Sequence, residues 1–363
     1  HKPSNSDIYT VELAEFVKTF FRVAVPDHFR YSFYIEGGAA AVENALKVSF
    51  DWKVRKNFTK GYATEVGHKV LHFRHAFHGR SGYTLSLTNT DPAKTDYFPK
   101  FNDWPRIEPA IARFPLEGGN LDATVADEEQ SLAAVRQAFI DNRDEIACVI
   151  IEPIQAEGGD NHFRPEYLAG LRALCDEFDA LLIFDEVQTG IGLTGSMWAH
   201  QALGVVPDIM VFGKKTQVCG ILVTNRVDDV PNNVFHTHSR INSTWGGNLV
   251  DMVRFTRLLE IIEADGLVEN AATVGAHLLK KIDEIDTEFP SLLTNARGRG
   301  LLCAFDLPTM EQRDDFRRHC YDHGLIIIPC GSHSIRFRPP LTITAEEIDT
   351  GAEIMRIAAR EIS

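Results

Sequence analysis

Three short and almost entirely apolar runs constrain the fold of this chain more than any other feature. They are IACVIIEPI (146–154), ALLIFDE (180–186) and DIMVFG (208–213), separated by a helical pattern and a glycine-containing loop. Strands that are apolar throughout are typical of parallel sheets whose two faces are covered by helices. The sequence therefore predicts an α/β fold with a large, mostly parallel sheet.

The segments before these runs extend the same pattern. YSFYI (31–35) precedes a predicted helix from about Ala39 to Phe58, and KVLHF (69–73) and TLSL (84–87) read as further strands. Two acidic residues, Asp185 and Glu186, end one of the apolar runs. The large α/β domain is expected to occupy residues 1–247 and to bind a cofactor.

The pattern of helical and strand-like segments changes after about Gly247. Two long helical patterns (248–264 and 267–287) lead to shorter β-rich and helical segments, which include SIRFRPPL (334–341). Residues 248–363 are therefore predicted to form a linking helix and a smaller C-terminal α+β domain.

Charge and cysteine content narrow the class of protein. Lys and Arg number 37 against 51 Asp and Glu, which gives a net charge of -14 without a basic block, so we expect no nucleic-acid or membrane partner. The 6 cysteines form no CxxC pair, which is typical of a reducing compartment. No apolar run is long enough for a transmembrane helix, and we expect a cytoplasmic protein.

The carboxyl ends of parallel strands are where reactive groups gather, so strand-end residues are the candidates for chemistry. Asp185 could hold Mg²⁺ in a nucleotide hydrolase, but that function needs a GxxxxGK[ST] loop, which the sequence lacks. Lysines 214 and 215 directly follow another apolar run in PDIMVFGKKTQVCG. Strand alternation predicts that the two side chains point to opposite sides, so that only one of them faces a site.

Four other segments add weaker signals. EGGAAAVENALK (36–47) places glycines at the start of a helix, where free amides bind phosphate, although such glycines often mark only a turn. LHFRHAFHGRSG (71–82) has three histidines, but no carboxylate or cysteine completes a metal site, and none is expected. INSTWGGN (241–248) suits an anion pocket, and SIRFRPPL carries arginines suited to a carboxylate.

One chemistry requires all of these parts together. A phosphate cradle, a strand-end carboxylate, a strand-end lysine and carboxylate-binding arginines make up a pyridoxal-phosphate site. The lysine supplies a primary amine for a Schiff base and a proton shuttle, and the acid keeps the pyridine nitrogen protonated. We therefore expect pyridoxal 5′-phosphate as the cofactor.

The same segments, in the same order, resemble the class III (fold type I) pyridoxal-phosphate aminotransferases, and within them the branch that acts on the 6-amino group of lysine. The resemblance spans Glu36 to Leu341. It rests on EGGAAAVENALK, AFHGRSGYTLSLTNT, IEPIQAEGGD, LLIFDEVQTG, PDIMVFGKKTQVCG, NSTWGGN, RGRGL and RFRPPL. Family members carry a further N-terminal part, so we expect this sequence to be the remainder of a longer protein.

The resemblance implies a role for each cofactor residue. Lys214 matches the Schiff-base lysine, Asp185 the acid at the pyridine nitrogen, and Gln188 lies beside the ring oxygen. Phe77 stacks on the ring. The phosphate is held by the amides of Gly38 and Ala39 and by Thr244, which the neighbouring subunit donates. Glu152 supports the region of Asp185.

It also implies a set of substrate residues. Arg80 holds the carboxylate distal to the reacting group, and Arg336 takes the α-carboxylate of 2-oxoglutarate, with Arg338 the less favoured choice. Glu157 pairs with Arg336 when lysine is bound and swings away for the oxo acid. Gln188 and Asn242 lie near the substrate.

The expected reaction moves the 6-amino group of L-lysine to 2-oxoglutarate and gives 2-aminoadipate 6-semialdehyde and L-glutamate. A homodimer with active sites at the subunit interface is expected. Three alternatives stay open at this point: a class III ω-aminotransferase for ornithine or 4-aminobutyrate, an aminomutase of the same fold, and a non-catalytic binding homologue.

Overall fold

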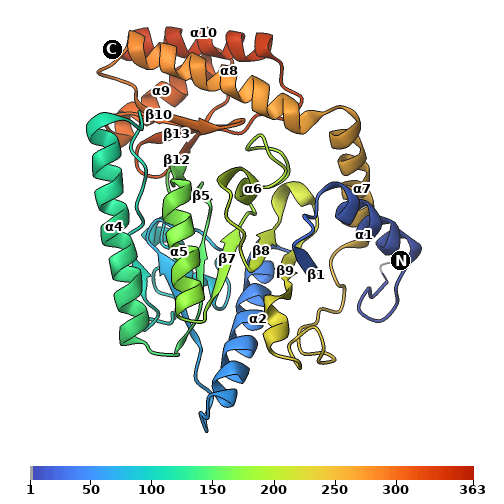
Figure 1. Cartoon of the computed structure of the whole chain (residues 1–363). Helices are drawn as coiled ribbons and strands as arrows, with labels where there is room; N and C mark the ends of the chain where they lie inside the picture. Colours follow the sequence, from blue (N-terminus) through green and yellow to red (C-terminus); the bar gives the residue numbers. More distant parts are fainter. Residues whose placement is uncertain (1–2) are drawn as a thin grey trace.

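A seven-stranded sheet forms the centre of the larger part of the chain in the computed structural model, which describes residues 3–363 (Figure 1). The strands in spatial order are β1 (Phe29–Ile35), β9 (Cys219–Thr224), β8 (Ile209–Phe212), β7 (Leu181–Asp185), β4 (Ile146–Ile151), β2 (Lys69–Phe73) and β3 (Arg106–Ile107). Pairing is parallel from β8 to β3, and β9 runs antiparallel to both of its neighbours. The predicted mostly parallel sheet is confirmed.

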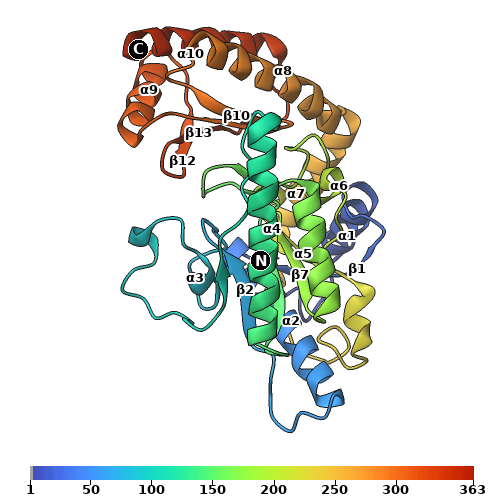
Figure 2. The same ribbon diagram turned by 60° about the vertical axis from the view of Figure 1, so that its left-hand side comes forward.

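Strand alternation divides the apolar side chains of β7 between two helical layers. Leu181 and Ile183 pack in one cluster with α2 (Gly38–Thr59). Leu182 and Phe184 pack on the other face, against α4 (Gly118–Asp141) and α5 (Pro165–Glu177). Figure 2 shows α4 and α5 side by side along that face. Because successive side chains alternate, Asp185 at the end of β7 belongs to the α2 side.

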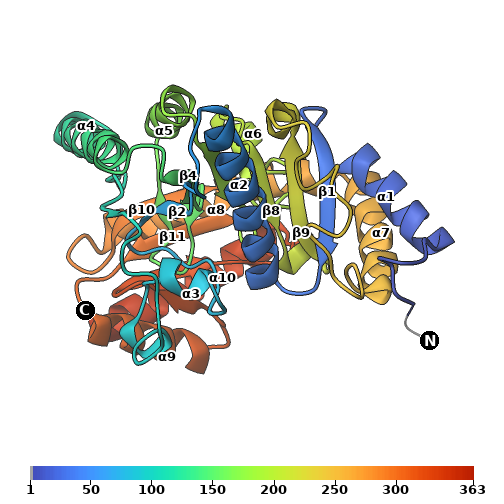
Figure 3. The same cartoon turned by 90° about the horizontal axis from the view of Figure 1, so that it is seen from below.

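A third cluster covers the antiparallel edge. Met210 and Phe212 of β8 pack with aromatic residues of α1 (Val11–Val23) and of α7 (Leu249–Ala264), and these two helices lie side by side (Figure 3). The side chain of Thr10 caps α1 by accepting a hydrogen bond from the amide of Leu13 at 3.2 Å. The N-terminal helix is therefore bound to the chain after residue 248.

The C-terminal part has its own sheet and its own core. Four antiparallel strands lie in the order β10 (Thr294–Arg299), β11 (Leu302–Asp306), β13 (Ser334–Phe337) and β12 (Ile328–Cys330). They pack with α8 (Leu267–Glu288), α9 (Met310–Asp322) and α10 (Ala345–Ile362). A capping box of Thr344 and Glu347 starts the last helix. The division of the chain at residue 247 stays a prediction.

The prediction of a strand at 84–87 is wrong. These residues form the short, fully buried helix α3 (Thr84–Leu87). The hydroxyl of Thr84 donates to the carbonyl of Ser81 at 2.7 Å and accepts from its amide at 3.1 Å, while the amide of Thr84 donates to Glu43 at 3.2 Å. These bonds close a turn, and the apolar pattern of four residues reflects burial alone.

The remaining elements are short. They are η1 (Pro92–Lys94), β5 (Ile154–Gln155), β6 (Asn161–His162), α6 (Ala199–Leu203), η2 (Lys214–Thr216) and η3 (Asn225–Asp229). Among residues 3–363, no helix combines the length and the apolar character needed to cross a bilayer.

Candidate active site

The first turn of α2 is open to an anion. Its N-cap, Gly37, has φ of 94°, and no side chain of residues 3–363 caps the helix. The first turn also contains no acidic residue, and a side chain built on Gly37 would meet nothing within 4 Å. The amides of Gly38 and Ala39 belong to this first turn, at the positive end of the helix dipole, which suits a phosphate.

Asp185, the predicted acid, is held rigidly at the end of β7. It is 4% exposed, and its Oδ1 accepts from the amide of Val187 at 3.1 Å. Its Oδ2 lies 2.8 Å from Nδ1 of His78, which is also buried. Nε2 of His78 has no partner among the described residues. Ring and carboxylate thus orient each other.

The sequence interpretation missed His78. It considered the histidines of LHFRHAFHGRSG (71–82) only as possible metal ligands, because nothing local links positions 78 and 185. The three histidines of that segment do not form a metal site: no group of three or more His, Cys, Asp or Glu suited to a metal occurs within residues 3–363.

Glu152 is a second buried carboxylate beside this pair. Burial is the main reason that its pKa is raised to about 7, and the nearby charge of Asp185 adds to the effect. Its Oε1 accepts from the amide of Phe77 at 2.9 Å, and its Oε2 from that of Ala156 at 3.3 Å. Glu152 thereby fixes the backbone of Phe77, whose ring is half-buried.

Close backbone approaches bring the α2 end of the site together. A Cβ built on Gly38 would lie 3.5 Å from a methyl of Val187, and one on Gly213 would lie 3.3 Å from the same methyl. Gly79 has φ of 123°, and a Cβ there would lie 2.5 Å from that of Ala39. The start of α2, the HGR loop and the ends of β7 and β8 therefore meet at one place.

The two lysines after β8 lie in the turn η2 rather than on a strand, so the predicted reason for their difference is wrong. Lys214 has φ of 54° and an exposed side chain. Nζ of Lys215 donates to the carbonyl of Gln188 at 2.6 Å, and its burial lowers the pKa of its amine to about 7. The turn thus leaves Lys214 available and gives Lys215 a structural contact.

A second group of charges surrounds Glu157. Its Oε2 accepts from Nη2 of Arg336 on β13 at 3.0 Å, and its Oε1 from Nζ of Lys94 at 2.6 Å. Burial alone would raise the pKa of Glu157, but the two cations outweigh it and the pKa is lowered. Nε and Nη1 of Arg336 are buried without a partner among the described residues. Each of these donors forms a two-donor fork only together with Nη2, so a carboxylate can bind through two hydrogen bonds once Glu157 leaves Nη2.

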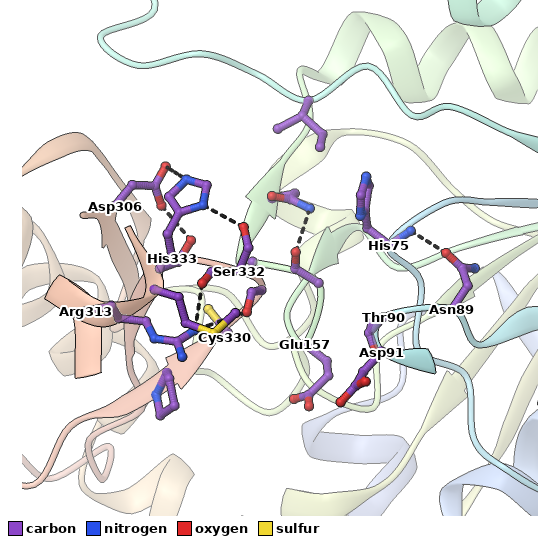
Figure 4. A pocket seen from close by; sticks show the side chains of 18 of the residues that line it. His75, Asn89, Thr90, Asp91, Glu157, Asp306, Arg313, Cys330, Ser332 and His333 are labelled. Carbon is purple, nitrogen blue, oxygen red and sulfur yellow. Dashed lines mark hydrogen bonds and ion pairs between the residues drawn. The ribbon is translucent and has the colours of Figure 1, made fainter. Parts of the chain in front are cut away.

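Glu157 also borders a cavity of about 780 Å³ between the two parts of the chain. Figure 4 shows Glu157 near Thr90 and Asp91 on one side of this cavity. Arg313 and Asp306, from the C-terminal part of the chain, line the other side. The loop before η1 and the small sheet therefore both approach Glu157.

The other predicted substrate residues occupy different surroundings. Arg338 pairs with Asp160 and leaves Nε without a partner among the described residues, whereas Arg336 leaves both Nε and Nη1. Arg80 is exposed in the HGR loop. Asn242 and Thr244 lie in the loop before α7, where the carbonyl of Thr244 accepts from Ser6 at 3.2 Å. Within residues 3–363 no hydrogen bond joins these two residues to Lys214 or Asp185.

Comparison with known proteins agrees with this geometry. The family model described as "Aminotransferase class-III" matches residues 6–358. The chain belongs to the class-III aminotransferase family. The L-lysine-epsilon aminotransferase of Mycobacterium tuberculosis is 55% identical over 358 residues, which are 99% of this chain and 79% of that protein. That of Streptomyces clavuligerus is 50% identical over 359 residues, 98% of this chain and 77% of that protein.

A more distant relative and a solved structure complete the comparison. The 4-aminobutyrate aminotransferase of Saccharomyces cerevisiae is 32% identical over 346 residues, 90% of this chain and 72% of that protein. A solved lysine aminotransferase from M. tuberculosis, in the internal aldimine form, superposes with a TM-score of 0.97 at 54% identity and covers 100% of this chain and 82% of its own. The fold is that of the fold type I aminotransferases.

Members of this family use pyridoxal 5′-phosphate, and this class-III chain is an aminotransferase with that cofactor. The residues present fit the group. The uncapped α2 terminus provides amides for a phosphate, Asp185 provides a fixed buried carboxylate, and Lys214 provides an accessible amine. Gly79 leaves room beside Ala39 that no larger residue could leave.

Proposed function

We propose that this enzyme transfers the 6-amino group of L-lysine to 2-oxoglutarate and forms 2-aminoadipate 6-semialdehyde and L-glutamate. The observation that carries the proposal is the ion pair of Glu157 with Arg336, which leaves two donors of the guanidinium unused. Relatives named L-lysine-epsilon aminotransferase are 50–55% identical, against 32–35% for those named 4-aminobutyrate aminotransferase.

The cofactor supplies a ring that withdraws electrons from the substrate carbon bearing the nitrogen. Lys214 is the residue that moves the proton: its Nζ takes a proton from C6 of lysine and serves both half-reactions. Its exposed position in η2 supports this role, because the amine must reach each incoming substrate.

Other residues hold and orient the cofactor. The Asp185 carboxylate favours a protonated nitrogen opposite it, His78 and the amide of Val187 keep that carboxylate in place, and Glu152 holds the backbone of Phe77. Phe77 covers the face of the ring, Gln188 contacts its oxygen, and the amides at Gly38 and Ala39 hold the phosphate. We assign these roles from the match to the family's motifs.

Two substrates of different charge share this pocket. The reacting end of lysine carries no carboxylate, so Glu157 pairs with Arg336 and neutralises it. The α-carboxylate of 2-oxoglutarate takes the place of Glu157 on Arg336, and an unpaired buried cation is avoided in both cases. Arg80 holds the distal carboxylate of either substrate, and Asn242 contacts the substrate chain.

We further propose a homodimer whose subunits complete each other's sites. Thr244 and Asn242 lie beside a groove of about 660 Å³ lined by Tyr9, Leu13 and Phe33, where exposed apolar surface such as Tyr9 is available to a second copy. Thr244 then reaches the phosphate bound to the partner. All six cysteines are free and buried, which supports a cytoplasmic location.

A panel of amines with 2-oxoglutarate tests the substrate. We expect kcat/KM to be highest for L-lysine, and we expect ornithine and 4-aminobutyrate to be poor amino donors. A kcat/KM for ornithine far above that for lysine would refute the lysine assignment. Conversion of lysine without any oxo acid would instead identify an aminomutase, and no reaction with any amine would identify a binding homologue.

A further inference from the structure

Lys94 contacts Glu157, a proposed substrate residue, but lies in none of the sequence motifs that predicted the site. It ends η1, the short turn whose N-cap Asp91 accepts from the amide of Ala93 at 2.9 Å. Its Nζ lies 2.6 Å from Oε1 of Glu157 and 5.6 Å from the ring centroid of Phe77. The side chain is 27% exposed, and its amine also lies 3.5 Å from the hydroxyl of Thr90.

Each oxygen of Glu157 has its own cation. Oε1 accepts from Lys94 and Oε2 from Arg336. Loss of the Arg336 contact therefore need not leave Glu157 without a counter-charge, because the bond to Lys94 uses the other oxygen. The carboxylate can turn about its contact with Lys94 while Nη2 of Arg336 becomes free for the substrate carboxylate.

We propose that Lys94 is a specificity-determining residue that holds Glu157 when Arg336 releases it, and thereby favours the dicarboxylate oxo acid over the amine donor. This inference rests on the proposed function. With the amine bound, Glu157 bridges both cations. With the oxo acid bound, the substrate carboxylate pairs with Arg336 and Glu157 pairs with Lys94, so every charge keeps a partner.

Removal of the positive charge of Lys94 weakens binding of the dicarboxylate oxo acid and leaves binding of the amine donor unchanged. Without Lys94, Arg336 is the only cation paired with Glu157 among residues 3–363, and displacement of Glu157 leaves a half-buried carboxylate unpaired. Dicarboxylate binding becomes less favourable by about tenfold, the usual effect of losing one charge-assisted hydrogen bond. The amine half-reaction keeps its Glu157–Arg336 pair and is unaffected.

The test uses the full-length holoenzyme and its Lys94→Met, Lys94→Arg and Lys100→Met variants. Calorimetry gives the Kd of glutarate, a dicarboxylate that cannot react, and single-turnover kinetics give the rate and half-saturation of each half-reaction. For Lys94→Met we expect about tenfold weaker glutarate binding and a similar rise in half-saturation by 2-oxoglutarate. The maximal rates and the lysine half-reaction stay as in the wild type, and Lys94→Arg and Lys100→Met bind glutarate normally.

A double-mutant cycle shows whether Lys94 acts through Glu157. In a Glu157→Gln background, Lys94→Met is expected to have no further effect on glutarate binding. Equal losses for both substrates, unchanged glutarate binding in Lys94→Met, or a loss that persists in the Glu157→Gln background would each overturn the inference. A wild-type enzyme that does not use lysine refutes the proposed function itself, whereas normal lysine turnover with unchanged glutarate binding refutes only the role of Lys94.

Discussion

The two carboxylate groups of the site differ in how they are held. Asp185 and Glu152 are 4% and 3% exposed, and their partners are backbone amides and a buried imidazole. The side chain of Glu157 is 28% exposed, and its partners are two long side chains that also reach solvent. A carboxylate in the first environment cannot change partners without a large desolvation cost, whereas one in the second can. The chain thus combines a fixed charge with an exchangeable one.

The largest effect on turnover is expected for the lysine that lies beside the fixed carboxylates, Lys214. Lys214→Ala removes the amine that we propose transfers the proton, and its turnover should fall by about 10⁴-fold or more. Steady-state kinetics with saturating lysine and 2-oxoglutarate measure this loss. Lys215→Met is the matched control, because Lys215 contacts only the carbonyl of Gln188 through its amine and should lose far less activity. A larger loss in the control would reverse the assignment of the two lysines.

Replacement of the fixed carboxylate comes next. Asp185→Asn keeps the size of the side chain but removes the charge that faces His78, so turnover should fall by about 10²–10³-fold, as for other preorganised electrostatic groups. Both half-reactions should slow together, and single-turnover rates for lysine and for 2-oxoglutarate check this. A loss confined to one substrate would place Asp185 in the exchangeable group instead.

Glu152 should make stability depend on pH. Its folded pKa of about 7 lies above the ordinary 4.5, so the folded state holds a proton that the unfolded state releases between these values. Stability is fully present below about pH 4.5 and falls by up to about 3 kcal/mol as the pH rises through 7. Urea unfolding at several pH values measures the slope. In Glu152→Gln this slope should flatten, and an unchanged slope would show that another group is responsible.

The smallest effect should come from the exchangeable carboxylate. Glu157→Gln removes the charge that neutralises Arg336 during the lysine half-reaction, so lysine should be used about tenfold less efficiently. 2-Oxoglutarate no longer has to displace an anion and should bind at least as well as before. Half-saturation constants of the two half-reactions report both changes. Equal losses for the two substrates would contradict an exchange at Arg336.

The sequence predicted those features that depend on local pattern. Apolar runs between helices indicated the parallel sheet, and the resemblance to the class III aminotransferases assigned roles to Lys214, Asp185 and Gly38, which stay predictions. Residues 84–87 were misread because four buried residues in a turn look like a short strand. The contacts of His78 and Lys94 could not be predicted, since they join positions 107 and 63 residues apart through the packing of separate loops.

The fate of each lysine nitrogen tests the central claim most directly. L-Lysine carrying a heavy nitrogen isotope at either the 6-amino or the 2-amino group is incubated with the full-length enzyme, cofactor and 2-oxoglutarate, and the glutamate formed is analysed by mass spectrometry. We predict that the 6-amino label appears in glutamate and that the 2-amino label stays in the lysine-derived product. Transfer of the 2-amino label, or unlabelled glutamate in both experiments, would contradict the proposed function.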